Sequence, residues 1–404
     1  MRRRLNLREH VPSGPHRLSI EQRDALQEAG LSLTMEPAAG TDGAYHLTPG
    51  SVVGAVEVGD LSVLIAPKIG IPQLLTLVCF ATGTFQPTHE LFGYPRDEAP
   101  ADVLALSLGS AARRAFGRGL LHGYRSEDDA LPTVRGRIRL DEQIRRRHGV
   151  APPIEVRFDE FTDDITENRL VKSAVGLLGR MRLRSPAARR ELGWIAGILM
   201  NVSTVEYPAG AVPGVQFDRL NEHYREVVGL ARLVLQHCTF ESGRGGVRAS
   251  GFRVDMTTVF QNLVTTGLRQ ALGLSPETFG EQKIRSLDKG GAVNLQPDLT
   301  WRHGGSVVFV GDAKYKNLAG GLPNADIYQL LAYVTAASLP GGLLIYAKGE
   351  AQPAIFTLRG SRRRLEVVAL DLSGTLDEVL ERLCAIANRV KALRDEATAW
   401  PNAA

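Results

Sequence analysis

The stretch that decides the fold reads Leu295-Gln296-Pro297-Asp298 and, after a short loop, Val308-Phe309-Val310-Gly311-Asp312-Ala313-Lys314. Both parts are typical of short apolar strands, and a polar turn containing glycine joins them. Each strand delivers one aspartate, and the strand period of two places Asp312 and Lys314 on the same face. The two converging carboxylates of Asp298 and Asp312 predict a site for a hard cation such as Mg²⁺, with Mn²⁺ as an alternative.

We expect the two strands to cover residues 292–301 and 306–310. The backbone carbonyl of Ala313 would add a further oxygen ligand for the cation. The ammonium of Lys314, beside the metal, would orient a water molecule and stabilise the negative charge of a phosphate. The alternative interpretation is that Asp312 and Lys314 form a solvated ion pair at the end of a strand.

A helix is predicted after the strands, beginning at Asn324 and ending before Pro340. Gln329 and Tyr333 lie four positions apart on one of its faces, so both side chains can point toward the carboxylates. The alternative is that Tyr333 is a half-buried packing residue.

Pro297-Asp298 together with Asp312-Ala313-Lys314 resembles the PD-(D/E)xK nuclease motif, and Gln329-x-x-x-Tyr333 is similar to the accessory motif of RecB-type nucleases. Residues 64–69 and residues 164–172 resemble stretches of McrC, the nuclease subunit of the McrBC restriction system. The resemblance covers most of the chain and is most specific in its last part. It implies catalysis by Asp298, Asp312, Lys314, Gln329 and Tyr333.

The function that this resemblance implies is a Mg²⁺-dependent DNA endonuclease subunit of a modification-dependent restriction system. In that family a separate McrB-like AAA+ GTPase ring recognises methylated DNA and translocates. McrC docks on the ring, stimulates its GTP hydrolysis and cuts, and it oligomerises through the ring. The sequence contains no G-x-x-x-x-G-K-[ST] loop, which fits that division of labour. Two rival interpretations are a nuclease-dead adaptor that only activates the ring and a stand-alone RecB-type repair nuclease.

The first core helix of this nuclease fold commonly supplies an additional acidic residue. The corresponding helix, expected over residues 256–272, has Gln261 at that place. An amide oxygen can bind a metal but adds no negative charge, and Gln261 can also be a solvated amide on the helix surface. Three nearby acids are candidates to replace it: Asp255, Glu277 and Glu281.

The whole chain has 404 residues, long enough for two or three domains, and 44% hydrophobic residues to build their cores. Its three cysteines lie far apart without a C-x-x-C pair, which indicates reduced thiols in a cytoplasmic protein. No apolar run approaches the length of a membrane span. The net charge of +4 permits nucleic-acid binding without demonstrating it.

The expected fold class is α/β, or α+β overall, in three parts. Residues 1–90 predict a β-rich N-terminal domain, with a hairpin within residues 51–66, that docks on the partner. Residues 91–245 predict a mixed, largely helical middle region, and residues 246–404 predict the PD-(D/E)xK core with a mixed sheet. Removing residues 1 to about 85 should leave a folded nuclease domain that neither binds the GTPase nor stimulates its hydrolysis.

Two stretches of the middle region have unusual charge. Residues 134–148 hold an expected strand over 134–140 and six arginines, the best candidates in the chain for contacts with a phosphate backbone. A charge run is also typical of a solvated face. Residues 158–172 begin with an acidic half, which predicts a helix start capped by Asp164 or Thr166 rather than a calcium loop.

Overall fold

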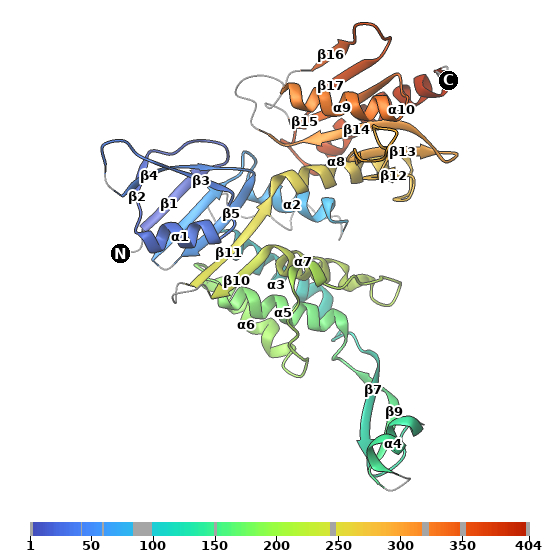
Figure 1. The fold of residues 1–404 in the computed structure, drawn as a ribbon. Coiled ribbons are helices and arrows are strands. Elements are labelled where there is room, and N and C mark those ends of the chain that lie inside the picture. Colours follow the sequence, from blue (N-terminus) through green and yellow to red (C-terminus); the bar gives the residue numbers. More distant parts are fainter. Residues whose placement is uncertain are drawn as a thin grey trace. The chain divides into compact units, whose positions relative to one another are not determined.

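The computed structural model describes residues 3–41, 43–58, 60–83, 99–148, 152–242, 248–316, 323–347 and 353–400. The chain folds into two compact units, drawn in Figure 1. The first unit joins Met1–Pro100 to Thr239–Ala404, and the second is Ala101–Cys238. Among the described residues no helix is both long and apolar enough to cross a membrane.

The first unit contains a five-stranded sheet with the strand order β1-β6-β5-β11-β10. Its strands are β1 (Arg3–Arg8), β5 (Val52–Val58), β6 (Leu61–Ala66), β10 (Cys238–Ser242) and β11 (Arg248–Asp255). The predicted hairpin is present as β5 and β6, and alternate residues of β6 are buried, as the strand period requires. β11 pairs antiparallel along β5, so one sheet combines strands from two distant parts of the chain.

A small sheet with the order β2-β4-β3 and two helices complete the N-terminal part. These elements are β2 (Pro15–Arg17), β3 (Leu33–Pro37), β4 (Ala44–Pro49), α1 (Ile20–Glu28) and α2 (Ile71–Ala81). α1 begins after Ser19, whose side chain accepts from the Gln22 amide in a capping box. α2 is apolar on nearly every side and buried along most of its length, and it packs on two helices of the last part of the chain.

The last part of the chain folds around a six-stranded sheet with the order β12-β13-β14-β15-β17-β16. Its strands are β12 (Phe279–Gly280), β13 (Leu299–His303), β14 (Ser306–Lys314), β15 (Gly341–Ala347), β16 (Ala354–Thr357) and β17 (Arg364–Leu370). The central strands β14, β15 and β17 are parallel and the outer pairs are antiparallel, which gives the predicted mixed sheet.

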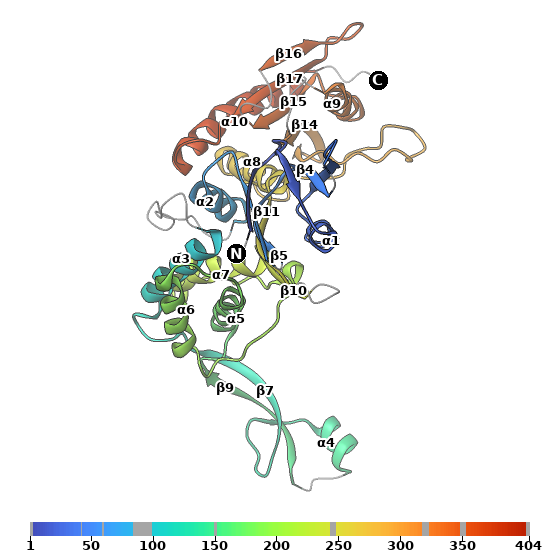
Figure 2. The same cartoon turned by 90° about the vertical axis from the view of Figure 1, so that its left-hand side faces the viewer.

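Three helices cover this sheet: α8 (Met256–Leu272), α9 (Asn324–Ala336) and α10 (Leu376–Ala399). Figure 2 shows α9 on one side of the sheet and α8 with α10 on the other. Leu330 and Val334 of α9 pack in one core with Val310 and Leu344 of the sheet. Even-numbered residues of β14 therefore face α9, and its odd-numbered residues face the opposite helices.

The strand bounds around the predicted hairpin differ from the sequence expectation. The first strand, expected over residues 292–301, begins only at Leu299. The preceding segment is a loop because the Asp288 carboxylate accepts hydrogen bonds from the amides of Ala292 and Val293. The second strand is longer than residues 306–310 and continues through Lys314, because β15 pairs with it there.

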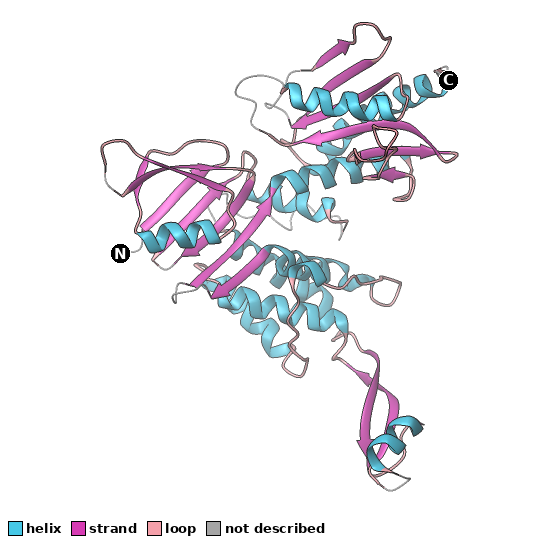
Figure 3. Cartoon of the chain, in the orientation of Figure 1, coloured by secondary structure: helices cyan, strands magenta, loops and turns pink. Residues whose placement is uncertain are grey.

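The second unit is a helical body with a long arm that contains a three-stranded sheet, visible in Figure 3. The helices of the body are α3 (Pro100–Phe116), α5 (Thr166–Arg180), α6 (Pro186–Ile198), η1 (Ala209–Ala211), η2 (Glu222–Tyr224) and α7 (Arg225–His237). The arm consists of β7 (Gly123–Leu131), β8 (Arg137–Ile138), α4 (Leu140–Arg147) and β9 (Ile154–Thr162). Polar residues dominate β7, so a search for alternating apolar residues does not find this strand.

The division of the chain differs from the three predicted domains. The predicted boundaries after residues 90 and 245 lie outside the described residues. The described part of residues 1–90 does not form a unit of its own, because β11 completes its sheet and α2 packs on α8 and α10. The strand expected over residues 134–140 lies in the arm, and only its residues Arg137–Ile138 form a strand, β8.

Candidate active site

The β13–β14 hairpin brings Asp298 and Asp312 together. The pairing of Leu299 with Gly311 places Asp298 opposite Asp312 at the next register position. The Asp298 amide donates to Asp312 Oδ1 over 3.3 Å, and Asp298 Oδ2 accepts from the Ala313 amide over 3.1 Å. The two carboxylates therefore lie side by side at the end of the hairpin, where the sequence predicted that they would converge.

Lys314 joins this pair from the same strand. Its ammonium forms an ion pair with Asp312 Oδ2, and both side chains are largely shielded from water. The alternative of a solvated ion pair does not hold, because Asp312 is only 1% exposed. A buried carboxylate beside a second carboxylate needs a cation, and in the metal-free chain Lys314 provides it.

Gln261 reaches the site from α8. Its side-chain amide donates from Nε2 to Asp298 Oδ2 over 3.0 Å, so it is not an isolated surface amide. Rotation about the last side-chain bond would present the amide oxygen instead. The site therefore has an amide, rather than a third acid, beside the two carboxylates.

The three substitute acids have other partners. Asp255 caps α8 by accepting from the Thr257 amide and also accepts from the Ser51 hydroxyl. Glu281 accepts from Gln296, and the pKa of Glu277 is lowered by a hydrogen bond from Ser275. Within the described residues there is no group of three or more histidine, cysteine, aspartate or glutamate side chains arranged to hold a metal.

Tyr333 and Gln329 form the α9 side of the site. Gln329 Nε2 donates to the Tyr333 hydroxyl over 2.7 Å, and Tyr333 is 4% exposed. Burial and then the negative charge of Asp312 raise the pKa of Tyr333, with a smaller contribution from Asp298. The hydroxyl therefore lies within electrostatic range of both carboxylates and keeps its proton.

The electrostatics of the site fit a divalent cation. Burial, followed by the charge of Asp312 and a hydrogen bond with it, raises the pKa of Asp298 to about 7. Asp312 Oδ2 is buried and accepts no hydrogen bond, although the Lys314 ammonium lies against it. The donors in reach are oxygens, which Mg²⁺ and Mn²⁺ prefer. The Ala313 carbonyl belongs to this set, since the amide and carbonyl of a strand residue point to the same side.

The raised pKa of Asp298 predicts how stability changes with pH in the absence of metal. Because the folded state holds this proton more tightly than the unfolded state, stability should fall as pH rises from about 4 to about 7. Asp298→Asn should remove a change on the order of 1–2 kcal/mol from the unfolding free energy. Urea unfolding of the metal-free proteins at pH 5 and pH 8 measures this difference, and equal pH dependence in both proteins would contradict it.

The position of Gln261 predicts the effect of restoring a carboxylate. Gln261→Glu should lower the Mg²⁺ concentration for half-maximal cleavage severalfold, because a third carboxylate adds charge next to the cation. The same change should lower the stability of the metal-free protein, because the introduced carboxylate would repel Asp298. A Mg²⁺ titration of cleavage tests the first effect, and an unchanged midpoint would mean that Gln261 only packs.

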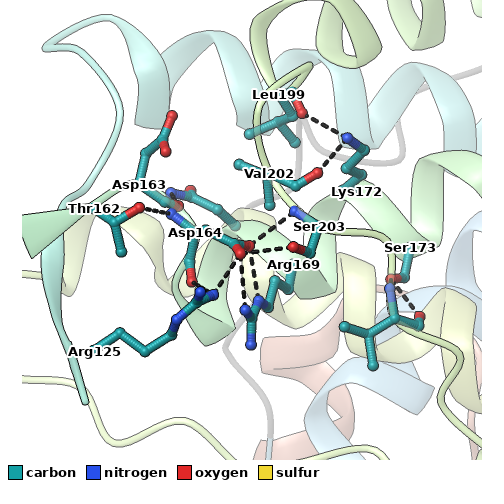
Figure 4. A network of polar contacts seen from close by, with 12 residues as sticks. Arg125, Thr162, Asp163, Asp164, Arg169, Lys172, Ser173, Leu199, Val202 and Ser203 are labelled. Atoms are coloured by element: carbon teal, nitrogen blue, oxygen red, sulfur yellow. Dashed lines mark hydrogen bonds and ion pairs between the residues drawn. The ribbon is translucent and has the colours of Figure 1, made fainter. Parts of the chain in front are cut away.

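The Asp164 network explains the second stretch that resembles McrC. Figure 4 shows Arg125, Arg169 and Ser203 converging on the Asp164 carboxylate. Burial would raise the pKa of Asp164, but the hydrogen bonds from Ser203 and the charge of Arg125 lower it. Neither Asp164 nor Thr166 caps α5 as predicted. The oxygens of Asp164 have these other partners, Thr166 is the first residue of the helix, and Ile165 takes the cap position.

The same network holds the root of the arm. Asn168 Nδ2 donates to the carbonyls of Leu121 and Asp163, which stand at the two ends of the arm. Lys172 donates to the carbonyls of Leu199, Met200 and Val202 in the segment after α6. This stretch therefore has a structural role within the second unit.

The arginines of the arm are mostly paired within the arm. The ion pairs are Arg135–Glu160, Arg139–Asp128, Arg145–Glu142, Arg146–Glu142, Arg147–Glu155 and Arg157–Asp128. Such pairing reduces the positive field that a phosphate backbone would meet. DNA contact by this cluster stays a prediction that the charge balance of the arm does not favour.

Several residues around the site were not found from the sequence. Glu9, Tyr315 and Asp326 are buried polar residues whose hydrogen bonds meet at the end of β14. The sequence held a signal for Tyr315 and Asp326. The strand alternation continues past Lys314 to Tyr315, and Asp326 precedes Gln329 by one helical turn. The partner of Tyr315 is far away in the sequence, and no local pattern indicates it.

Comparison with known proteins places the chain among restriction-system components. The family model described as "McrBC 5-methylcytosine restriction system component" matches residues 47–347, which include every candidate site residue named from the sequence. The Type IV methyl-directed restriction enzyme EcoKMcrBC of Escherichia coli (strain K12) is 22% identical over 301 residues, 69% of this chain and 86% of that protein.

A solved structure shares the fold. It is a refined half-complex from a tetradecameric assembly of Thermococcus gammatolerans McrB AAA+ hexamers with bound McrC. The matching chain has a TM-score of 0.60 and 20% identity, and the match covers 96% of this chain and 100% of that chain.

Proposed function

This chain belongs to the family of McrBC 5-methylcytosine restriction system components, and we propose that it is the Mg²⁺-dependent DNA endonuclease subunit of such a system. The observation that carries the proposal is the convergence of Asp298, Asp312 and Lys314 at the end of one hairpin. The mixed sheet between α9 and α8 with α10 is then a PD-(D/E)xK core.

The chain's own residues have separate roles in this proposal. Asp298, Asp312 and the Ala313 carbonyl would hold the cation, and Gln261 would contribute its amide oxygen. Bound Mg²⁺, or Mn²⁺, supplies Lewis acidity at the scissile phosphate. The Lys314 ammonium, which pairs with Asp312 in the metal-free chain, would orient water and stabilise the charge that develops on the phosphate.

α9 forms the wall opposite these ligands. The hydroxyl of Tyr333 is protonated at neutral pH, as an ordinary tyrosine is, and burial raises its pKa further. It can therefore donate a hydrogen bond to a phosphate rather than repel it. Gln329 is exposed and fixes that hydroxyl from its own helix. These two side chains therefore help to orient the DNA strand beside the carboxylates.

The proposed partner is an McrB-like AAA+ GTPase ring, through which the subunit assembles. Support comes from the structure that shares the fold, since McrC is bound to McrB AAA+ hexamers there. A partner is also needed to select the target, because phosphate contacts position a protein on DNA without reading its sequence.

A nuclease-dead adaptor is the second candidate, and the neutral Gln261 favours it. One experiment separates the two functions: the chain is produced with its GTPase partner and incubated with methylated and unmethylated DNA, GTP and Mg²⁺. The nuclease proposal requires Mg²⁺-dependent cuts in the methylated DNA. An adaptor stimulates GTP hydrolysis without any cut, and cleavage that does not need the partner indicates a stand-alone repair nuclease.

A further inference from the structure

Directly beyond the candidate active site, side-chain contacts hold the end of β14 on both faces of the sheet. Lys314 is the last residue of β14, and Tyr315 and Lys316 follow it. Because side chains alternate along an extended chain, Lys316 continues the face of Asp312 and Lys314, and Tyr315 points to the opposite face. Both residues meet a buried carboxylate.

On one face, Glu9 holds Tyr315. The Tyr315 hydroxyl donates to Glu9 Oε1 over 2.8 Å, and the Lys68 backbone amide donates to the same oxygen. Glu9 is 1% exposed and follows β1 directly, while the Tyr315 ring lies 5.9 Å from that of Phe260 on α8. The N-terminal sheet is thereby hydrogen-bonded to the residue next to Lys314.

On the other face, Asp326 holds Lys316. The Lys316 ammonium lies 2.6 Å from Asp326 Oδ1, and the Tyr346 hydroxyl of β15 donates to Asp326 Oδ2. Asp326 is 3% exposed and lies in the first turn of α9, the helix that also carries Gln329 and Tyr333. This contact fixes α9 relative to the strand that bears Asp312.

Burying these carboxylates has an energetic cost that apolar packing would avoid. Burial raises the pKa of Glu9, and its second oxygen, Oε2, is buried without a hydrogen bond. Apolar side chains of similar size would hold a sheet together at least as well. What they would not provide is a directional bond that fixes where the strand ends, and catalysis is sensitive to displacements of about 1 Å.

We propose that Glu9, acting through the Tyr315 hydroxyl, is a positioning residue for the candidate active site. It sets the place of Lys314 from one face of the sheet while Asp326 sets it from the other. Neither carboxylate is a catalytic residue, since neither touches the reacting atoms. The inference rests on the proposed nuclease function, and Glu9 precedes the residues that the family model matches.

The test uses the full chain with its GTPase partner, saturating Mg²⁺ and methylated DNA. Tyr315→Phe removes only the hydroxyl and should slow single-turnover cleavage about 10-fold. The DNA concentration for half-saturation should stay unchanged, because Tyr315 is buried and its hydroxyl is bonded to Glu9. Glu9→Gln keeps an acceptor oxygen and should cut faster than Glu9→Ala, while Asp326→Asn weakens the second contact and should also slow cleavage.

Tyr224→Phe is the matched control. Tyr224 is fully buried in the second unit, and its hydroxyl accepts a hydrogen bond from the Leu121 amide over 2.8 Å. Its loss should lower the melting temperature as Tyr315→Phe does without slowing the cleavage step. The proposal is overturned if Tyr315→Phe cuts at the unaltered rate, or if Tyr224→Phe slows cleavage equally.

A chain that never cuts DNA would refute the proposed function, and hydrogen exchange would then decide this inference. Tyr315→Phe should speed amide exchange at residues 312–316, and Tyr224→Phe should leave exchange there unchanged. Unchanged exchange in Tyr315→Phe would overturn the positioning role.

Discussion

Asp298→Ala and Lys314→Ala should each reduce Mg²⁺-dependent cleavage by at least about 100-fold while DNA binding and partner binding persist. Asp298 is expected to supply one of two carboxylate ligands, so its loss leaves the cation with Asp312 alone. Lys314 is expected to act on the phosphate, so its loss should lower the cleavage rate more than the Mg²⁺ affinity. A Mg²⁺ titration of the single-turnover rate separates these two effects.

The two variants should differ in stability. Lys314→Ala leaves the buried Asp312 carboxylate without its cation, and removing one partner of a buried pair costs about 3–5 kcal/mol. Mg²⁺ should restore much of this loss by taking the place of the ammonium. Asp298→Ala removes one of two neighbouring negative charges, so the metal-free protein should melt at a similar or higher temperature.

Lys289→Ala is the control for both variants, because Lys289 is an exposed lysine in the loop before β13. It should cut at the unaltered rate. Retained cleavage in Asp298→Ala or Lys314→Ala would sink the assignment of the site, whatever the behaviour of the control.

The candidate site was largely predictable because its members are close in sequence. Asp298, Asp312 and Lys314 lie on one hairpin, and the strand period alone orients the last two. Gln329 and Tyr333 follow on the next helix, where the helical period gives their common face. What the sequence could not provide was the Lys314–Asp312 ion pair or the bond from Gln261 to Asp298, since both depend on side-chain conformation in the packed site.

The fold was less predictable wherever distant segments pair. β5 and β6 are neighbours joined by a tight turn, and their alternating residues indicate a hairpin. β11 fits β5 equally well in the structure, but no local pattern tells a strand which distant edge it will join. β7 was missed for another reason: its polar residues are stabilised by cross-strand pairs with β9, so it shows no apolar alternation.

The pairing of β11 with β5 reverses the expected result of removing residues 1–85. That truncation should now leave a last part that does not fold, rather than a separate nuclease domain. It would remove β1, β5 and β6 from the sheet and strip α2 from α8 and α10. Phe252 and Val254 of β11, both at most 1% exposed, would lose their cover.

The size of the loss supports this expectation. Each large apolar side chain moved from the core to water costs about 1.5–3 kcal/mol. α2 alone carries Leu74, Leu75, Leu77 and Val78 in fully buried positions. Without α2, the side chains of α8 and α10 that pack on this helix are left uncovered. At that cost for each of the four, the loss is about 6–12 kcal/mol, comparable to the about 5–15 kcal/mol by which a domain is usually stable. Partner binding lost by this truncation would therefore say nothing about where the partner docks.

A deletion in the arm is the matched comparison. Replacing residues 127–158 by an Asn-Gly turn shortens the arm at the pairing of Ser126 with Asp159 and keeps the ion pair of Arg125 with Asp164. The arm's ladder is formed by its own strands, so this variant should retain a cooperative melt while the 1–85 truncation should not. Thermal unfolding and limited proteolysis of both proteins decide the matter, and a protease-resistant, cooperatively melting truncation would show that the nuclease core is independent of the N-terminal sheet after all.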